Sequence, residues 1–301
     1  MKGRAEEDGG HGGGGMDMAE GEKRCKLVVV YHPDFAVHGY PALRERIAPA
    51  FEELRSRGIL EREGVRLLEA VPAEEELAEA VHTEGHIQGV KRSGYYRVAL
   101  LSAGSVIMGA EEVARGRAEA AFSFTGTAGH HASRDGFWGF CYLNDVAMAL
   151  LRLRREDMGR RVAVVDIDPH FGDGTRDILG DDPGVLHVNF HSGYVMGKTD
   201  GPHNLDLALP HDAGDAQFLE AVEKAVAAAE EFRPELLFVV FGHDSHRDDY
   251  GAFELGDGVY REFALRLRRA FPSGVVYVLS GGARPHVARR AIGDVVEVLA
   301  G

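Results

Sequence analysis

The sequence predicts an α/β protein with a single open parallel sheet that helices cover on both faces. From residue 26 onward, short apolar runs rich in β-branched residues alternate with longer amphipathic segments, a pattern typical of successive βαβ units. Polar clusters directly follow several of the apolar runs, as they do where parallel strands end at a ligand site. The 301 residues are enough for one large domain with a substantial core.

Six strands are expected from apolar runs that are too short to be ordinary helices. They comprise residues 26–31, 120–124, 161–167, 184–190, 235–241 and 274–280. Eight segments with helical periodicity lie before, between and after them. These are residues 43–57, 74–80, 84–92, 96–115, 142–155, 214–232, 258–270 and 285–300.

The first 24 residues differ in composition from the rest of the chain. They are dense in Gly and charged residues and cannot bury enough apolar surface to offset the loss of chain entropy. We therefore expect a disordered Gly-rich tail at 1–24 and one catalytic domain at 25–301. An alternative is that translation starts at Met16 or Met18.

Charge and cysteine content exclude several classes of protein. The 34 Lys and Arg against 48 Asp and Glu give a formal net charge of −14, which disfavours a nucleic-acid partner. Only Cys25 and Cys141 occur, so cysteine-based zinc or redox motifs are excluded and His with carboxylate remains for metal chemistry. No apolar stretch reaches a membrane span and no export signal is visible, so we expect a cytoplasmic protein without a membrane partner.

Chemically active side chains follow four of the expected strands at their C-terminal ends. The carboxyl ends of parallel strands meet at one edge of the sheet, so these residues should converge on one site. They are His130 and His131 after the second strand, Asp166, Asp168, His170 and Asp173 after the third, His243, Asp244, His246 and Asp248 after the fifth, and the Gly-rich segment 280–286 after the sixth.

The segment DIDPH has the spacing of a metal site. Asp166, Asp168 and His170 are two residues apart, so in an extended chain their side chains point the same way. Two of them together with Asp244 would surround a divalent ion and leave a position for water, as a catalytic zinc site requires. The alternative is an acidic turn that caps a helix beginning near Gly174.

The adjacent pair His130 and His131 suits proton transfer. A neutral imidazole can take a proton from water near pH 7 while its neighbour orients or tunes it. Each ring needs a carboxylate on its other nitrogen, and Asp166 and Asp173 are the unassigned carboxylates close by. A pair of surface or core histidines without a catalytic role is the alternative.

Seven segments, in this order and spacing, resemble the histone deacetylase and acetylpolyamine amidohydrolase superfamily, specifically a bacterial or archaeal-type member. The resemblance implies an arginase/deacetylase-like open α/β fold over roughly residues 26–300. The segments that carry it are YHPDF with YPALRERI, VHTEGHI, AGHHA, GFCYLND, VDIDPHFGDGT and FGHDSHRDD.

The resemblance also implies roles for individual residues. Asp168, His170 and Asp244 would bind one zinc ion per chain, and His131 would be the general base and acid. His130 would be its electrostatic partner, with Asp166 and Asp173 as the carboxylates behind the pair. Gly139 and Phe140 would line the tunnel for the acyl-amine, Cys141 would lie at its floor, and backbone near Asp166, Asp168, His170 and Phe190 could hold a structural potassium ion.

One departure from the family concerns the oxyanion donor. Family members usually have a Tyr after the last core strand, and here LSGGARPH places Ala283 at that position. Arg284, His286 or a Tyr from another loop, Tyr194 or Tyr250, could supply the donor. Alternatively, the substrate differs from an ordinary acetylamide, or the protein binds acyl-amines with little turnover.

The function expected from these residues is zinc-dependent hydrolysis of a linear amide. The substrate would be acetyl-lysine, an acetylpolyamine or another small N-acyl amine, and the acidic composition favours a cationic small molecule. Two alternatives remain, namely an acyl-amine binding protein with weak or no catalysis and a binuclear manganese ureohydrolase. The sequence gives no prediction of oligomeric state.

Overall fold

The apolar runs of the sequence form the strands of one parallel sheet in the computed structural model, which describes residues 24–193, 195 and 200–301. The expected tail at 1–24 lies outside the described residues except for Arg24. Eight strands pair in the order β2-β1-β3-β8-β7-β4-β5-β6. Their bounds are β1 Cys25–Tyr31, β2 Val65–Glu69, β3 Ala118–Ser123, β4 Val162–Asp166, β5 Val185–His191, β6 Asn204–Ala208, β7 Leu236–Phe241 and β8 Val275–Leu279.

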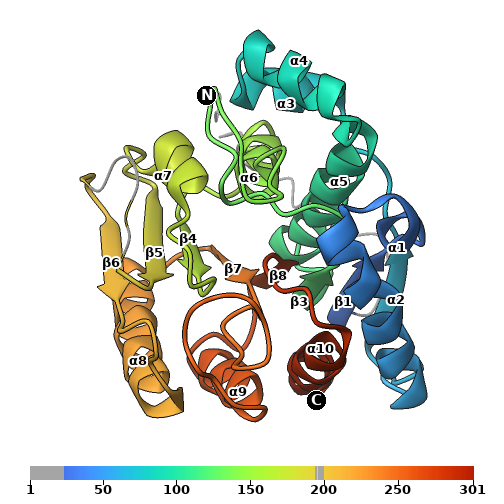
Figure 1. Ribbon diagram of the computed structural model, residues 1–301, viewed down its shortest axis with the longest axis vertical. Helices are drawn as coiled ribbons and strands as arrows, with labels where there is room; N and C mark the ends of the chain where they lie inside the picture. Colours follow the sequence, from blue (N-terminus) through green and yellow to red (C-terminus); the bar gives the residue numbers. More distant parts are fainter. Residues whose placement is uncertain (1–23, 194, 196–199) are drawn as a thin grey trace, which may run out of the picture.

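Helices pack on both faces of this sheet, which confirms the predicted fold class (Figure 1). One layer contains α5, α6 and α7, with α3 and α4 beyond it; the other contains α2, α8, α9 and α10, and α1 lies beside α2. No helix in the described ranges is both long and apolar enough to cross a membrane. The bounds are α1 Asp34–His38, α2 Pro41–Ser56, α3 Glu75–Val81, α4 Glu84–Ser93, α5 Tyr96–Ala114, α6 Asp145–Arg154, α7 Asp173–Leu179, α8 Asp215–Phe232, α9 Val259–Ala270 and α10 Pro285–Ala300.

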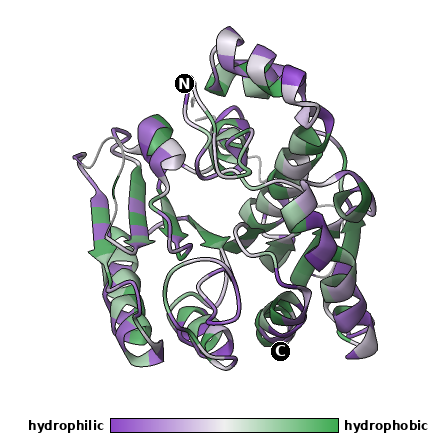
Figure 2. Ribbon diagram, in the orientation of Figure 1, coloured by the Kyte–Doolittle hydropathy of each residue, from purple (hydrophilic) through white to green (hydrophobic). Residues whose placement is uncertain are grey.

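All six expected strands and all eight expected helices are present, but two strands and the two short helices α1 and α7 were not expected. The missed strands, β2 and β6, are the two edges of the sheet, and their residues are only half-buried. Their sequences, VRLLE and NLDLA, lack the continuous apolar character of the central strands, because one side of an edge strand faces solvent. Figure 2 shows the contrast between green central strands and helices with mixed purple and green surfaces.

The strand order places four loops next to one another at the C-terminal ends of the central strands. Strands β3, β8, β7 and β4 are neighbours in the middle of the sheet, although β7 and β8 come last in the chain. All of them run parallel, so the loops that follow them begin on the same side of the molecule, where the strands end. These are the loops in which the sequence places its unusual polar residues.

Candidate metal centre and catalytic pocket

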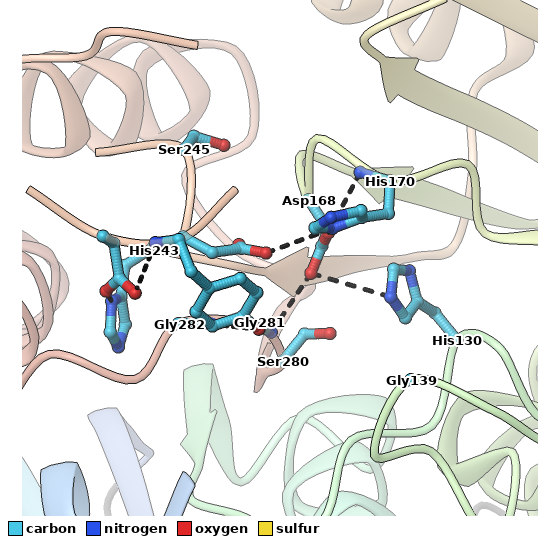
Figure 3. Close-up of polar contacts among 12 residues, drawn as sticks. His130, Gly139, Asp168, His170, His243, Ser245, Ser280, Gly281 and Gly282 are labelled. Atoms are coloured by element: carbon cyan, nitrogen blue, oxygen red, sulfur yellow. Dashed lines mark hydrogen bonds and ion pairs between the residues drawn. The ribbon is translucent and has the colours of Figure 1, made fainter. Parts of the chain in front are cut away.

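Three predicted metal ligands meet where the loops after β4 and β7 come together. Asp168, His170 and Asp244 each offer a ligand atom, and these atoms lie within 4.8 Å of one another. The Nδ1 atom of His170 is 2.7 Å from Asp168 Oδ1 and 3.2 Å from Asp244 Oδ2. In Figure 3, dashed lines join Asp168 to His170, His130 and Gly281. Among the described residues this is the one cluster with the composition and spacing of a metal site.

The chemistry of these three residues fits a divalent cation. Both carboxylate oxygens of Asp244 are buried and, apart from the contact with His170, have no hydrogen-bond partner. Burial and the neighbouring Asp168 carboxylate raise the pKa of Asp244 above its usual value. Gly281 approaches so closely that an added Cβ would lie 2.5 Å from Asp244 Oδ2, which explains why the loop needs glycine here. Two buried carboxylates and one imidazole are a ligand set that zinc accepts.

The first histidine of the pair faces two carboxylates. His130 Nδ1 donates to Asp166 Oδ2 at 2.9 Å, and its Nε2 lies 3.6 Å from Asp168 Oδ2. Burial alone would lower the pKa of His130, but Asp166 and Asp168 outweigh it and raise the value to about 9. In the metal-free site this pKa favours a protonated His130 beside Asp168.

The pKa of the second histidine shifts in the opposite direction. Burial and the adjacent His130 lower the pKa of His131 to about 4, although Asp173 acts against them. His131 Nδ1 donates to Asp173 Oδ1 at 2.6 Å, which leaves Nε2 with a free lone pair. A neutral imidazole with that geometry can accept a proton from water or substrate.

Trp138 contacts both His131 and the Asp173 carboxylate, and the sequence did not predict this position. The indole ring stacks on His131 with ring centroids 3.7 Å apart and an interplanar angle of 26°. Its Nε1 donates to Asp173 Oδ2 at 2.9 Å. The side chain thus contacts both members of the pair.

A cavity of about 160 Å³ opens onto two of the candidate ligands, Asp168 and His170, and onto the pair His130 and His131. Gly139 and Phe140 lie on its wall, and both have left-handed backbone, with φ of 58° and 70°. A Cβ on Gly139 would lie 2.6 Å from His131 Cδ2, so glycine lets the chain pass close to this imidazole. Cys141 is buried behind this turn, and burial raises the pKa of its thiol well above its usual range.

Two stacked histidines from the VHTEGHI segment hold the pocket loop in place. His82 and His86 have ring centroids 4.1 Å apart and an interplanar angle of 11°. His82 Nδ1 donates to the carbonyl of Ser133 at 2.8 Å, and its Nε2 accepts from the backbone N–H of Asn144 at 3.0 Å. His86 Nε2 donates to the carbonyl of Tyr142 at 2.7 Å. The loop that carries Gly139 and Phe140 is therefore fastened at both ends.

The candidates for the missing oxyanion donor lie in different places. Arg284 is exposed, and the side chain of His286 is 67% exposed and lies 3.8 Å from Asp248; neither lines the cavity. Tyr250 does line it, beside His170 and Gly281. Tyr194 lies outside the described residues.

Comparisons with known proteins agree with the motifs and the fold. A family model described as "Histone deacetylase domain" matches residues 40–299. The "Probable deacetylase" of Archaeoglobus fulgidus is 31% identical over 252 residues, which are 73% of this chain and 70% of that protein. The "Acetylpolyamine amidohydrolase" of Burkholderia pseudomallei is 35% identical over 167 residues, which are 51% of this chain and 48% of that protein.

A solved structure extends the agreement to almost the whole fold. The structure titled "Crystal Structure of HDA15 HD domain" matches with a TM-score of 0.84, covering 92% of this chain and 90% of that one at 21% identity. Among the curated relatives, the chain spans about half the length of the Burkholderia protein. The structural match shows that the arginase/deacetylase-like arrangement extends beyond the motif loops.

Proposed function

Because the chain belongs to the histone deacetylase family, as its motifs predicted, we propose that it is a zinc-dependent amidohydrolase. The family consists of hydrolases of linear amides, the enzyme class expected from the sequence. The proposed reaction removes an acetyl or other acyl group from an amine. The observation that carries the proposal is the position of neutral His131, with Nε2 free, beside the ligand cluster Asp168, His170 and Asp244.

Each residue of the site has a separate task in this reaction. Zinc bound by Asp168, His170 and Asp244 would polarise the acyl carbonyl and lower the pKa of a water molecule. His131 accepts the proton of the attacking water at Nε2 and returns it to the leaving amine. While His131 carries that proton, the Asp173 carboxylate stabilises the imidazolium through the 2.6 Å hydrogen bond to Nδ1.

The cationic neighbour His130 keeps this base in its reactive form. It repels a second proton and so lowers the pKa of His131, while Asp166 holds its own charge in place. The charge also lies beside Asp168 Oδ2, 3.6 Å from His130 Nε2, where it offsets the negative charge of that proposed zinc ligand. His130 therefore acts electrostatically, and proton transfer is left to His131.

The substrate that we propose is a small or side-chain N-acyl amine. A cavity of about 160 Å³ has room for an acyl group and part of an alkyl chain, which suits acetyl-lysine or an acetylpolyamine. The name of the Burkholderia relative supports the polyamine option. The net charge of −14 also favours a cationic amine through long-range attraction.

The test combines metal analysis and a substrate panel on one protein preparation. We expect one zinc ion per chain and turnover of an acetyl-lysine peptide or an acetylpolyamine. His131→Ala should abolish turnover and keep the zinc, while exposed His38→Ala serves as the matched control. Two manganese ions per chain with release of urea from a guanidino substrate would establish the ureohydrolase alternative. Hydroxamate binding without turnover of any amide would establish the binding protein and overturn the enzyme.

A further inference from the structure

Hydrolysis of an amide needs a hydrogen-bond donor for the carbonyl oxygen, because negative charge develops there during attack. Loss of one such donor typically costs on the order of 10²–10³-fold in rate. Most N–H groups at the cavity are already used: Trp138 Nε1 and His131 Nδ1 both donate to Asp173, and both nitrogens of His130 face carboxylates. The Nδ1 atom of His170 faces the carboxylates of Asp168 and Asp244, so its Nε2 atom lies on the side of the ring away from these two residues.

We propose that Tyr250 donates this hydrogen bond and takes the place of the side chain that Ala283 lacks. The proposal rests on the proposed amidohydrolase function. The Tyr250 Oη atom accepts a hydrogen bond from the backbone N–H of Gly282 at 3.1 Å. Its own O–H hydrogen has no acceptor among the described hydrogen bonds. The Gly282 contact thus fixes the oxygen and leaves the proton to point into the cavity.

The hydroxyl is held close to the metal ligands. Gly282 directly follows Gly281, whose N–H donates to Asp168 Oδ2 at 3.1 Å. The Tyr250 ring lies over His170 with centroids 6.3 Å apart and meets Phe140 edge-on at 6.2 Å. Tyr250 therefore extends from the tunnel wall to the ligand cluster, which is where the acyl carbonyl must lie.

Asp249 fixes the loop of Tyr250 against the loop after β8. Its carboxylate accepts from the backbone N–H of Ala283 at 2.9 Å, of Arg284 at 3.1 Å and of Tyr250 at 3.0 Å. His243 Nδ1 donates to the same carboxylate at 3.0 Å. One buried carboxylate thus joins the two loops, and the donor is oriented before substrate binds.

Arg46 of α2 holds the other side of the loop after β8. Its fully buried guanidinium donates to the carbonyls of Ser280, of Gly281 at 2.5 Å and of Gly282 at 2.6 Å. The carbonyls point toward Arg46, so the Gly282 N–H points away from it, toward Tyr250. The loop after β8 has Ala283 at the position where the family usually has a Tyr. In this protein the same loop instead holds the hydroxyl of Tyr250 through the Gly282 N–H.

Tyr250→Phe tests the proposal because it removes one oxygen and keeps the ring. We expect kcat for the best substrate of the panel to fall on the order of 10²–10³-fold, with KM little changed and zinc content intact. Tyr95→Phe is the matched control, since Tyr95 packs against Tyr40 and Tyr142 outside the cavity. An unchanged kcat in Tyr250→Phe would overturn the proposal.

A binding measurement gives a second answer that does not depend on turnover. A trifluoromethyl ketone hydrate presents a tetrahedral oxygen to the donor, whereas an alkyl thiol binds the metal without one. Tyr250→Phe should weaken the ketone at least about tenfold and leave the affinity of the thiol unchanged. Equal weakening of both ligands, or of neither, would overturn the donor role. If Tyr250→Phe weakens only the ketone but the wild-type protein hydrolyses no amide, the proposed function fails and the donor role stands.

Discussion

The stacked pair His82 and His86 makes the stability of the protein depend on pH through a group that is not among the proposed metal ligands. Burial, and then the neighbouring His86, lower the pKa of His82 from 6.5 to about 3. The ring is neutral in the folded protein, because its Nε2 accepts from the Asn144 N–H while Nδ1 donates to Ser133. Protonation would place the His82 Nε2–H against the Asn144 N–H at the end of the pocket loop.

The sign of the effect follows from the lowered pKa. Below pH 6.5 the unfolded chain binds a proton at His82 and the folded chain does not, so the free energy of unfolding falls as the pH falls. The contribution is complete above pH 6.5 and is lost progressively toward pH 3. Between pH 7 and pH 5 the difference is about 2 kcal/mol for this one group.

Urea unfolding at the two pH values measures this contribution. Metal-free protein should be used throughout, so that release of zinc does not add to the change. The loss of unfolding free energy between pH 7 and pH 5 should be about 2 kcal/mol smaller in His82→Gln than in the wild type. His82→Asn serves as a second variant, and exposed His38→Gln should behave as the wild type does. Equal losses in the wild type and in both His82 variants would refute the reasoning.

Three further predictions concern the site itself. Ala283→Tyr should raise kcat by less than about threefold, because Tyr250 already occupies the donor position; a gain of about tenfold or more would mean that the donor is missing. Trp138→Phe keeps a ring over the base but removes the N–H that bonds Asp173. A buried hydrogen bond to a charged group contributes roughly 1.5–3 kcal/mol, and the value for Trp138 should be lower because this side chain is 42% exposed. We therefore expect kcat to fall about tenfold with zinc retained. Unchanged kinetics would show that the hydrogen bond from Trp138 to Asp173 does not support catalysis. Asp244→Asn removes one anionic ligand and should leave the protein without stoichiometric zinc after dialysis, which metal analysis checks directly; full retention would exclude Asp244 as a ligand.

The sequence predicted the centre of the fold well because the strands there are buried on both faces. A strand such as β7, with six buried residues, needs a continuous apolar run, and such a run is visible without a structure. The same rule explains why polar residues at the ends of these strands stood out as candidate ligands. The edge strands β2 and β6 carry no comparable signal, since only part of each is buried.

Residues that act through backbone contacts were harder to find. Arg46 could have been noticed as a charged residue on an apolar helix face. It lies three positions after Leu43 and four before Ala50, which are both buried on the same side of α2. Nothing local shows that its guanidinium meets carbonyls 235 positions away. Tyr250 remained one of four candidates for the donor, because the choice depends on how two loops meet in space.

The central position of β7 and β8 determines the order in which the protein can be completed during synthesis. Before these last two strands leave the ribosome, β2-β1-β3 and β4-β5-β6 are separate groups, and β3 and β4 present unpaired edges. Such edges pair readily with other chains, so a chain that lacks β7 and β8 exposes two sites for aggregation. Asp244 and Gly281 directly follow β7 and β8, so the addition of these two strands completes both the sheet and the proposed metal site.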